Sequence, residues 1–149
     1  MQPSDRKAPP AMHARVGELV RVVAAHEISR QFLRFAAVGG VATLIHYAIL
    51  AGLVEFANAP LIASTSCGFA AGALFSYITN RHLNFETKPP FTRGLAKFLA
   101  FGLVGLGLNG LILGTLHHLG MHYMLAQCFA TGIVLVYNFA TARWVVFRA

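Results

Sequence analysis

Four long apolar stretches that carry no charged residue are the feature that most limits how this chain can fold. They cover residues 35–54, 61–79, 98–116 and 123–142, and none contains Lys, Arg, Asp or Glu. A helix of about 20 residues crosses a hydrocarbon core of roughly 30 Å, and it satisfies its own backbone hydrogen bonds there. We therefore expect an all-α membrane protein with four transmembrane helices.

The positions of the basic residues predict how these spans are oriented. All 12 Lys and Arg residues lie in the N-terminal leader, in the segment 81–97 or at the C-terminal end, whereas the connections at 55–60 and 117–122 contain none. Basic residues stay on the cytoplasmic side during insertion. Both termini and the 81–97 loop should therefore be cytoplasmic. The net charge of +7 is then explained by topology and anionic headgroups, and we expect no nucleic-acid partner.

The leader before the first span divides into two parts. Residues 1–11 are polar and rich in proline, and their composition predicts a disordered cytoplasmic segment. In residues 12–33 the apolar positions recur at helical spacing. This pattern predicts an amphipathic helix, which either lies in the cytoplasmic interface or is a solvated helix joined to the first span.

An internal repeat relates the two halves of the apolar region. The sequence RFAAVG at 34–39 returns as KFLAFG at 97–102. Each copy closes on an arginine followed four residues later by a phenylalanine, namely Arg81 with Phe85 and Arg143 with Phe147. We expect a four-helix transmembrane domain over 34–148, built as two hairpins of about 34–85 and 97–147. Because each hairpin has an even number of spans, the repeat is parallel.

Pairs of glycines four residues apart occur in the second and third spans. Gly68 with Gly72 and Gly110 with Gly114 are small-xxx-small pairs, which allow membrane helices to approach closely. Four helices enclose little space, so we also expect a homo-oligomer.

Residues suited to catalysis are few. The chain has no glycine-rich phosphate loop and no cysteine cluster, and none of its acidic residues lies within a span. We expect no enzymatic activity and no cofactor, and the missing intramembrane carboxylate argues against a proton-coupled drug exporter. His117, His118 and His122 gather in one outer connection. Without a carboxylate or cysteine nearby, they are expected to be interfacial polar residues and not a metal site.

Three polar side chains lie inside predicted spans, namely His46, Tyr47 and Asn109. Such groups are costly in lipid unless they meet a partner or a wet cavity. They either form hydrogen bonds between helices or line a path for a polar headgroup.

Basic and amide residues gather at the cytoplasmic ends of the spans. Arginine offers a planar fork for phosphate oxygens and lysine a point charge, so these residues are candidates for binding a lipid phosphate or sugar. The alternative is that they set topology and reach toward headgroups. The candidates are Arg34, Asn80, Arg81, Lys97, Asn138 and Arg143.

These motifs together are similar to a known family. RFxxVG opens the first span, NRxxxF closes the second, KF opens the third and NFxxxRWxxF ends the chain. In order and spacing they resemble the GtrA-like family of small four-helix membrane proteins. The chain departs from strict duplication at Ala142, which stands where Asn80 stands in the first copy.

The resemblance implies a function as well as a fold. It implies flipping of polyprenyl-phosphate-linked sugars across the bacterial cytoplasmic (inner) membrane for cell-surface polysaccharide biosynthesis, together with a membrane glycosyltransferase. The alternative is a non-transporting partner that anchors or organises such a glycosyltransferase. A polyprenyl tail stays in the bilayer while its headgroup crosses, so a narrow polar seam suffices, and we expect downhill movement.

Overall fold

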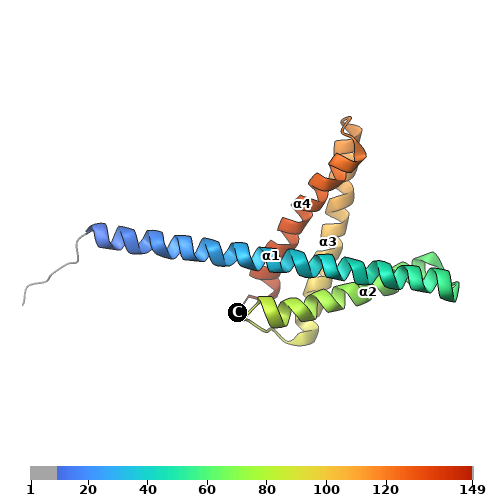
Figure 1. The fold of residues 1–149 in the computed structure, drawn as a ribbon, viewed down its shortest axis with the longest axis horizontal. Coiled ribbons are helices and arrows are strands. Elements are labelled where there is room, and N and C mark those ends of the chain that lie inside the picture. Colours follow the sequence, from blue (N-terminus) through green and yellow to red (C-terminus); the bar gives the residue numbers. More distant parts are fainter. Residues whose placement is uncertain (1–9, 149) are drawn as a thin grey trace, which may run out of the picture. The chain divides into compact units, whose positions relative to one another are not determined.

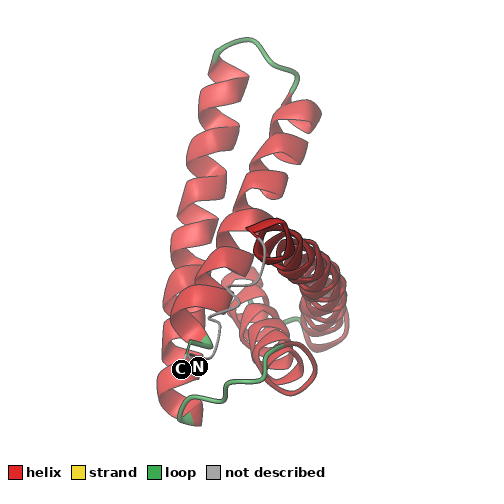
Figure 2. Ribbon diagram, turned by 90° about the vertical axis from the view of Figure 1, so that its left-hand side faces the viewer, coloured by secondary structure: helices red, strands yellow, loops and turns green. Residues whose placement is uncertain are grey.

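The computed structural model describes residues 10–148, which are almost entirely helical and contain no strand (Figures 1 and 2). The helices are α1 (Pro10–Ala57), α2 (Leu61–Thr79), α3 (Phe91–His118) and α4 (Tyr123–Thr141). Two π-helical turns, η1 (Asn80–Asn84) and η2 (Ala142–Val146), continue α2 and α4. Four segments are long and apolar enough to cross a membrane. The predicted all-α class with four spans is confirmed.

The described residues divide into two units, and the boundary falls between Leu33 and Arg34 within α1. In the first unit the helix exposes the apolar side chains of Val20, Val22 and Val23. Of the leader predicted to be disordered, residues 1–9 lie outside the described part, and the remaining two open α1. The interfacial position predicted for residues 12–33 stays a prediction.

The second unit consists of two helical hairpins whose local geometry repeats. In the first, the later part of α1 packs on α2, and in the second, α3 packs on α4 (Figure 1). The outer turns contain the two described residues with positive φ, Asn58 (49°) and Gly120 (90°), at corresponding positions of the repeat. Glycine adopts this conformation without a Cβ penalty, and asparagine tolerates it.

Both hairpins also end in the same way. The Asn80 carbonyl accepts the Phe85 N–H at 3.0 Å, and the Ala142 carbonyl accepts the Phe147 N–H at 2.9 Å. These five-residue spacings define a π turn, which widens the helix and rotates the side chains that follow it. The repeat recognised in the sequence is therefore also a repeat of backbone conformation.

Within the first hairpin, two glycines allow α2 to approach α1 closely. A Cβ built on Gly68 would lie 2.6 Å from the carbonyl oxygen of His46, and one on Gly72 would lie 2.6 Å from that of Ala42. The packing predicted for this pair is confirmed. Gly110 and Gly114 have nothing within 4 Å of such a Cβ in the described chain, so a packing role for them stays a prediction.

Aromatic contacts join the two hairpins near the ends of α2 and α4. Phe35 meets Phe139 edge-on with ring centroids 5.6 Å apart, and Tyr77 meets Phe98 at 5.7 Å. Phe98 is the repeat counterpart of Phe35, and Phe139 is that of Tyr77. Each hairpin therefore places its first helix against the second helix of the other. The two copies are related by an approximate twofold axis.

Candidate functional site

The basic end of the second unit, defined as the end that carries Arg34, Arg81, Lys97 and Arg143, also contains most of its buried side chains. Tyr77 is 0% exposed and lies among three rings. It stacks on Phe147 at 5.7 Å, and Phe91 packs edge-on against it at 5.3 Å. Gly94 makes room for this arrangement, since a Cβ there would lie 2.2 Å from the Tyr77 hydroxyl. Tyr77 was not among the predicted site residues.

Arg81 is held by the loop that joins the hairpins. Its Nη1 donates to the Tyr77 hydroxyl at 3.3 Å and to the carbonyl oxygen of Pro89. The Tyr77 hydroxyl in turn donates to the Phe91 carbonyl at 3.1 Å. A guanidinium that joins a helix end to the next loop stabilises the loop conformation, and each such bond to a charged group contributes about 1.5–3 kcal/mol. This role is visible only in the folded chain.

Asn80 lies next to Arg81 and is also engaged. It is 0% exposed, and its Nδ2 donates to the Ser76 carbonyl at 2.9 Å and the Ser76 hydroxyl at 3.3 Å. Its Oδ1 accepts from Asn84 Nδ2 at 3.0 Å. These bonds pair the buried amide with groups one helical turn before and after it, so the amide stabilises the end of the helix.

The other three basic residues of this end are placed differently. Arg34 is exposed, and Lys97 and Arg143 are half-buried. None of the three has a hydrogen-bonding or ion-pairing partner within residues 10–148. In the chain they adjoin Phe35, Phe98 and Ala142, all of which line one cavity. Within the described residues their charges are therefore unpaired, and each residue is the sequence neighbour of a residue that lines the cavity.

The cavity lies between the two hairpins and has a volume of about 280 Å³. Its walls are mostly apolar and include repeat-related residues from both hairpins. The pairs are Phe35 with Phe98, Gly39 with Gly102, and Ser76 with Asn138. The cavity thus lies on the approximate twofold axis. Mostly apolar pockets with a few placed polar groups are the usual form of a small-ligand site.

Asn138 lines this cavity and also carries a buried polar atom without a partner among the described residues. Its Oδ1 is buried and has no hydrogen-bond partner in the part of the chain that the structure describes. A Cβ on Gly105 would lie 2.7 Å from this oxygen, so the glycine leaves the space that the amide occupies. Of the two asparagines predicted as site residues, Asn138 faces the cavity and Asn80 does not line it.

The intramembrane polar residues occupy repeat-related positions. His46 Nε2 and Thr65 Oγ1 share a hydrogen bond of 3.1 Å between α1 and α2. Their counterparts Asn109 and Gln127 are joined between α3 and α4, where Gln127 Nε2 donates to Asn109 Oδ1 at 3.4 Å. Each hairpin therefore has one interhelical polar pair at the same level. This hydrogen-bonding alternative was left open by the sequence.

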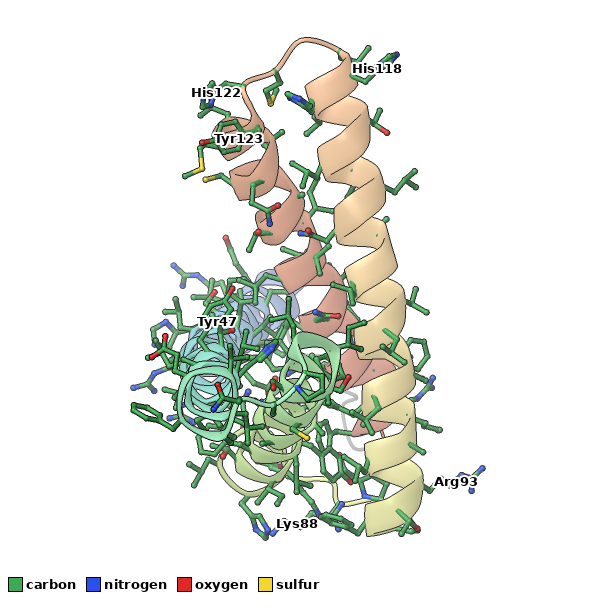
Figure 3. All side chains as sticks on the ribbon, turned by 90° about the vertical axis from the view of Figure 1, so that its right-hand side faces the viewer. Tyr47, Lys88, Arg93, His118, His122 and Tyr123 are labelled. Carbon is green, nitrogen blue, oxygen red and sulfur yellow. The ribbon has the colours of Figure 1, made fainter. Side chains whose placement is uncertain are left out.

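Only His46 among the three predicted path residues lines the cavity. Tyr47 stacks on the His46 ring at 5.4 Å but is 60% exposed, and Figure 3 shows it on the outer side of α1. Asn109 lies in the second hairpin outside the cavity lining. The structure therefore does not gather the three side chains at one place.

The histidines lie at the opposite end of the second hairpin from Lys88 and Arg93 (Figure 3). His117 Nδ1 shares a hydrogen bond with the Met121 carbonyl at 3.2 Å, and the Met124 N–H donates to His122 Nδ1 at 3.4 Å. Among the described residues no group of three or more His, Cys, Asp or Glu side chains could hold a metal ion. These imidazoles help to close the outer turn.

Comparison with known proteins gives a consistent picture. The family model of the GtrA/DPMS transmembrane domain matches residues 34–147. The uncharacterized membrane protein YwcD of Bacillus subtilis is 26% identical over 115 residues, covering 74% of this chain and 91% of the relative. The cell wall teichoic acid glycosylation protein GtcA of Listeria innocua is 24% identical over 121 residues, covering 78% and 83%. With four apolar helices and this match over most of its length, the chain is a multi-pass membrane protein of the GtrA/DPMS transmembrane domain family.

Proposed function

We propose that this protein moves polyprenyl-phosphate-linked sugars across the bacterial cytoplasmic membrane to supply cell-surface glycosylation. The observation that carries the proposal is the set of three unpaired cations, Arg34, Lys97 and Arg143, each adjoining a residue of the cavity between the hairpins. Such an arrangement suits an anionic headgroup that must leave the interface and enter the membrane. The relative named as a teichoic acid glycosylation protein supports the same process.

The physical requirements of this transfer are modest. The polyprenyl tail can remain in the bilayer, so only the sugar phosphate needs a polar route. Arginine and lysine lower the cost of bringing a phosphate to the membrane boundary by forming charge-assisted hydrogen bonds. In this proposal the basic end faces the cytoplasm, as the distribution of Lys and Arg favours. Arg81 and Asn80 maintain the fold beside the site, and a membrane glycosyltransferase is the partner.

Scrambling of a labelled lipid tests the proposal. The protein is reconstituted into liposomes with a fluorescent polyprenyl-phosphoryl hexose, and the fraction accessible to an external quencher is followed over time. We expect protein-dependent movement that Arg143→Ala slows at least about tenfold, since it removes a charge-assisted contact of about 1.5–3 kcal/mol. The matched control is Arg93→Ala. Arg93 is exposed at the same end of the second hairpin and lies outside the cavity (Figure 3), so its loss should leave the rate unchanged.

Two results would count against this function. Equal rates for Arg143→Ala and wild type would contradict a role of Arg143 in binding the headgroup. No movement by folded wild-type protein, with several sugar donors tried, would favour the alternative of a membrane partner that organises a glycosyltransferase. In that case, deleting the protein should release the enzyme from the membrane.

A further inference from the structure

The cavity between the hairpins differs from the basic end in carrying no formal charge. No Lys, Arg, Asp or Glu lines it among the described residues. Its polar side chains are hydroxyl, amide and imidazole groups contributed by three helices. They are Thr43 and His46 from α1, Ser76 from α2, and Asn138 and Thr141 from α4. A phosphate would lose its hydration there without meeting a cation, which is strongly unfavourable.

The polar side chains of the cavity suit a ligand that carries hydroxyl groups. The hydroxyls of Thr43, Ser76 and Thr141 and the amide of Asn138 can each donate and accept hydrogen bonds. A hydrocarbon chain would form no hydrogen bond with these groups, whereas ligand hydroxyls can pair with them in either direction.

The walls and size also restrict the occupant. Phe35 and Phe98 approach from the two hairpins, and Phe69 and Phe101 add further aromatic surface. The volume of about 280 Å³ far exceeds the roughly 10–15 Å³ that one water needs on the same measure, so a small organic ligand has room. One monosaccharide ring fits this description, because its C–H faces pack on aromatic rings while its hydroxyls meet amide and hydroxyl groups.

We infer that the cavity receives the sugar ring of the lipid-linked sugar while the phosphate stays with the cations beside it. This inference rests on the proposed function. It assigns the sugar and the phosphate of the headgroup to two chemically distinct sites. The sugar is bound on the approximate twofold axis, where Ser76 and Asn138 face the cavity from opposite hairpins. Selection among sugars then depends on neutral side chains, and affinity for the phosphate depends on Arg34, Lys97 and Arg143.

Equilibrium binding of two probes to protein in nanodiscs tests this division. The probes are radiolabelled citronellyl phosphate and a panel of citronellyl-phosphoryl sugars that contains glucose, galactose, mannose and arabinose. We expect at least one sugar probe to bind wild-type protein more tightly than the bare phosphate. Asn138→Leu should weaken the binding of that sugar probe about five- to tenfold, as expected for a lost hydrogen bond in a buried site. The affinity for the bare phosphate should not change.

Further variants separate the site from a folding defect. Thr43→Val lies in the other hairpin, keeps the shape of the side chain and should weaken the sugar probe in the same direction. Thr115→Val is the matched control, because Thr115 is exposed and outside the cavity. Unchanged binding of the bare phosphate reports a folded basic end in every variant.

The outcomes distinguish a failure of this inference from a failure of the proposed lipid-transfer function. If no sugar probe binds more tightly than the bare phosphate, or if Asn138→Leu and Thr43→Val weaken both probes equally, the sugar does not occupy the cavity. Lipid scrambling by the wild-type protein would then still support the proposed function. If wild-type protein neither binds the probes nor scrambles the lipid, the proposed function itself fails.

Discussion

Phe85 and Phe147 occupy the same position in the two copies of the repeat, and they stack on each other with ring centroids 4.5 Å apart and planes 11° from parallel. Each follows a π turn, and both rings are almost completely buried. The Thr87 hydroxyl donates to the Phe147 carbonyl and joins the connecting loop to the same place. The twofold relation between the hairpins therefore centres on this ring pair, which holds the basic end together.

The first prediction concerns the coupling between these two rings. Phe147→Ala should lower the free energy of unfolding by about 3 kcal/mol, because it removes a buried aromatic side chain. In a double-mutant cycle with Phe85→Ala, the double variant should lose about 0.5–1.5 kcal/mol less stability than the sum of the two single losses. Chemical unfolding in detergent measures all four free energies. Additive losses would show that the stack contributes no energy beyond the burial of each ring.

A second prediction concerns the close approach of α1 and α2. Gly72→Ala places a methyl group against the backbone of Ala42, so the helices must separate, and we expect a loss of stability above about 1 kcal/mol. Gly132 on α4 has open space around it. There the same change should stabilise the helix by up to about 1 kcal/mol through propensity alone. Thermal unfolding of the two variants should therefore shift in opposite directions, and a shift to higher temperature for Gly72→Ala would contradict this packing.

The spans and their duplication could be predicted because both depend on strong local patterns. Uncharged stretches of about 20 residues have few alternatives to a membrane helix, and the repeated Arg–Phe spacing marks corresponding helix ends. The sequence could not show which repeat-related residues contact each other. Phe85 and Phe147 occupy equivalent positions, but each ring could equally have packed inside its own hairpin. Only the folded structure shows that the two rings stack on each other.

Candidate residues for the site could be named from the sequence, but their geometry could not. Arg81 and Arg143 look alike in the sequence, yet Arg81 meets the Pro89 carbonyl of a loop whose path no local pattern specifies, while Arg143 has no such partner among the described residues. Ser76 was missed because a serine in an apolar span usually bonds its own backbone. Its alignment with Asn138 in the repeat was the available signal.

A third prediction uses the repeat to exchange the interhelical polar pairs. His46 bonds Thr65 in the first hairpin, and Asn109 bonds Gln127 in the second. His46→Asn or Thr65→Gln alone pairs side chains of mismatched length and should lower stability by about 0.6–2 kcal/mol. The double variant copies the second hairpin into the first and should recover most of that loss. Unfolding free energies of the three variants are the measurement, and no recovery would mean that the two positions differ in environment.

The last prediction separates the structural role of Arg81 from a role in ligand binding. Arg81→Gln breaks the bonds to Tyr77 and Pro89, so the loop that begins after Phe85 should open more often. Cleavage after the exposed Glu86 by a glutamyl endopeptidase measures this opening. We expect acceleration of about tenfold or more, given roughly 1.5–3 kcal/mol for a bond to a charged group.

Two comparisons make this assay specific. Tyr77→Phe removes the hydroxyl between Arg81 and the Phe91 carbonyl and should accelerate cleavage in the same direction. Arg143→Gln has no such bonds to break within the described residues, so it should leave cleavage unchanged while it slows lipid transfer. If Arg81→Gln slows transfer without changing cleavage, then Arg81 contacts the phosphate, and the two copies of the repeat use their arginines alike.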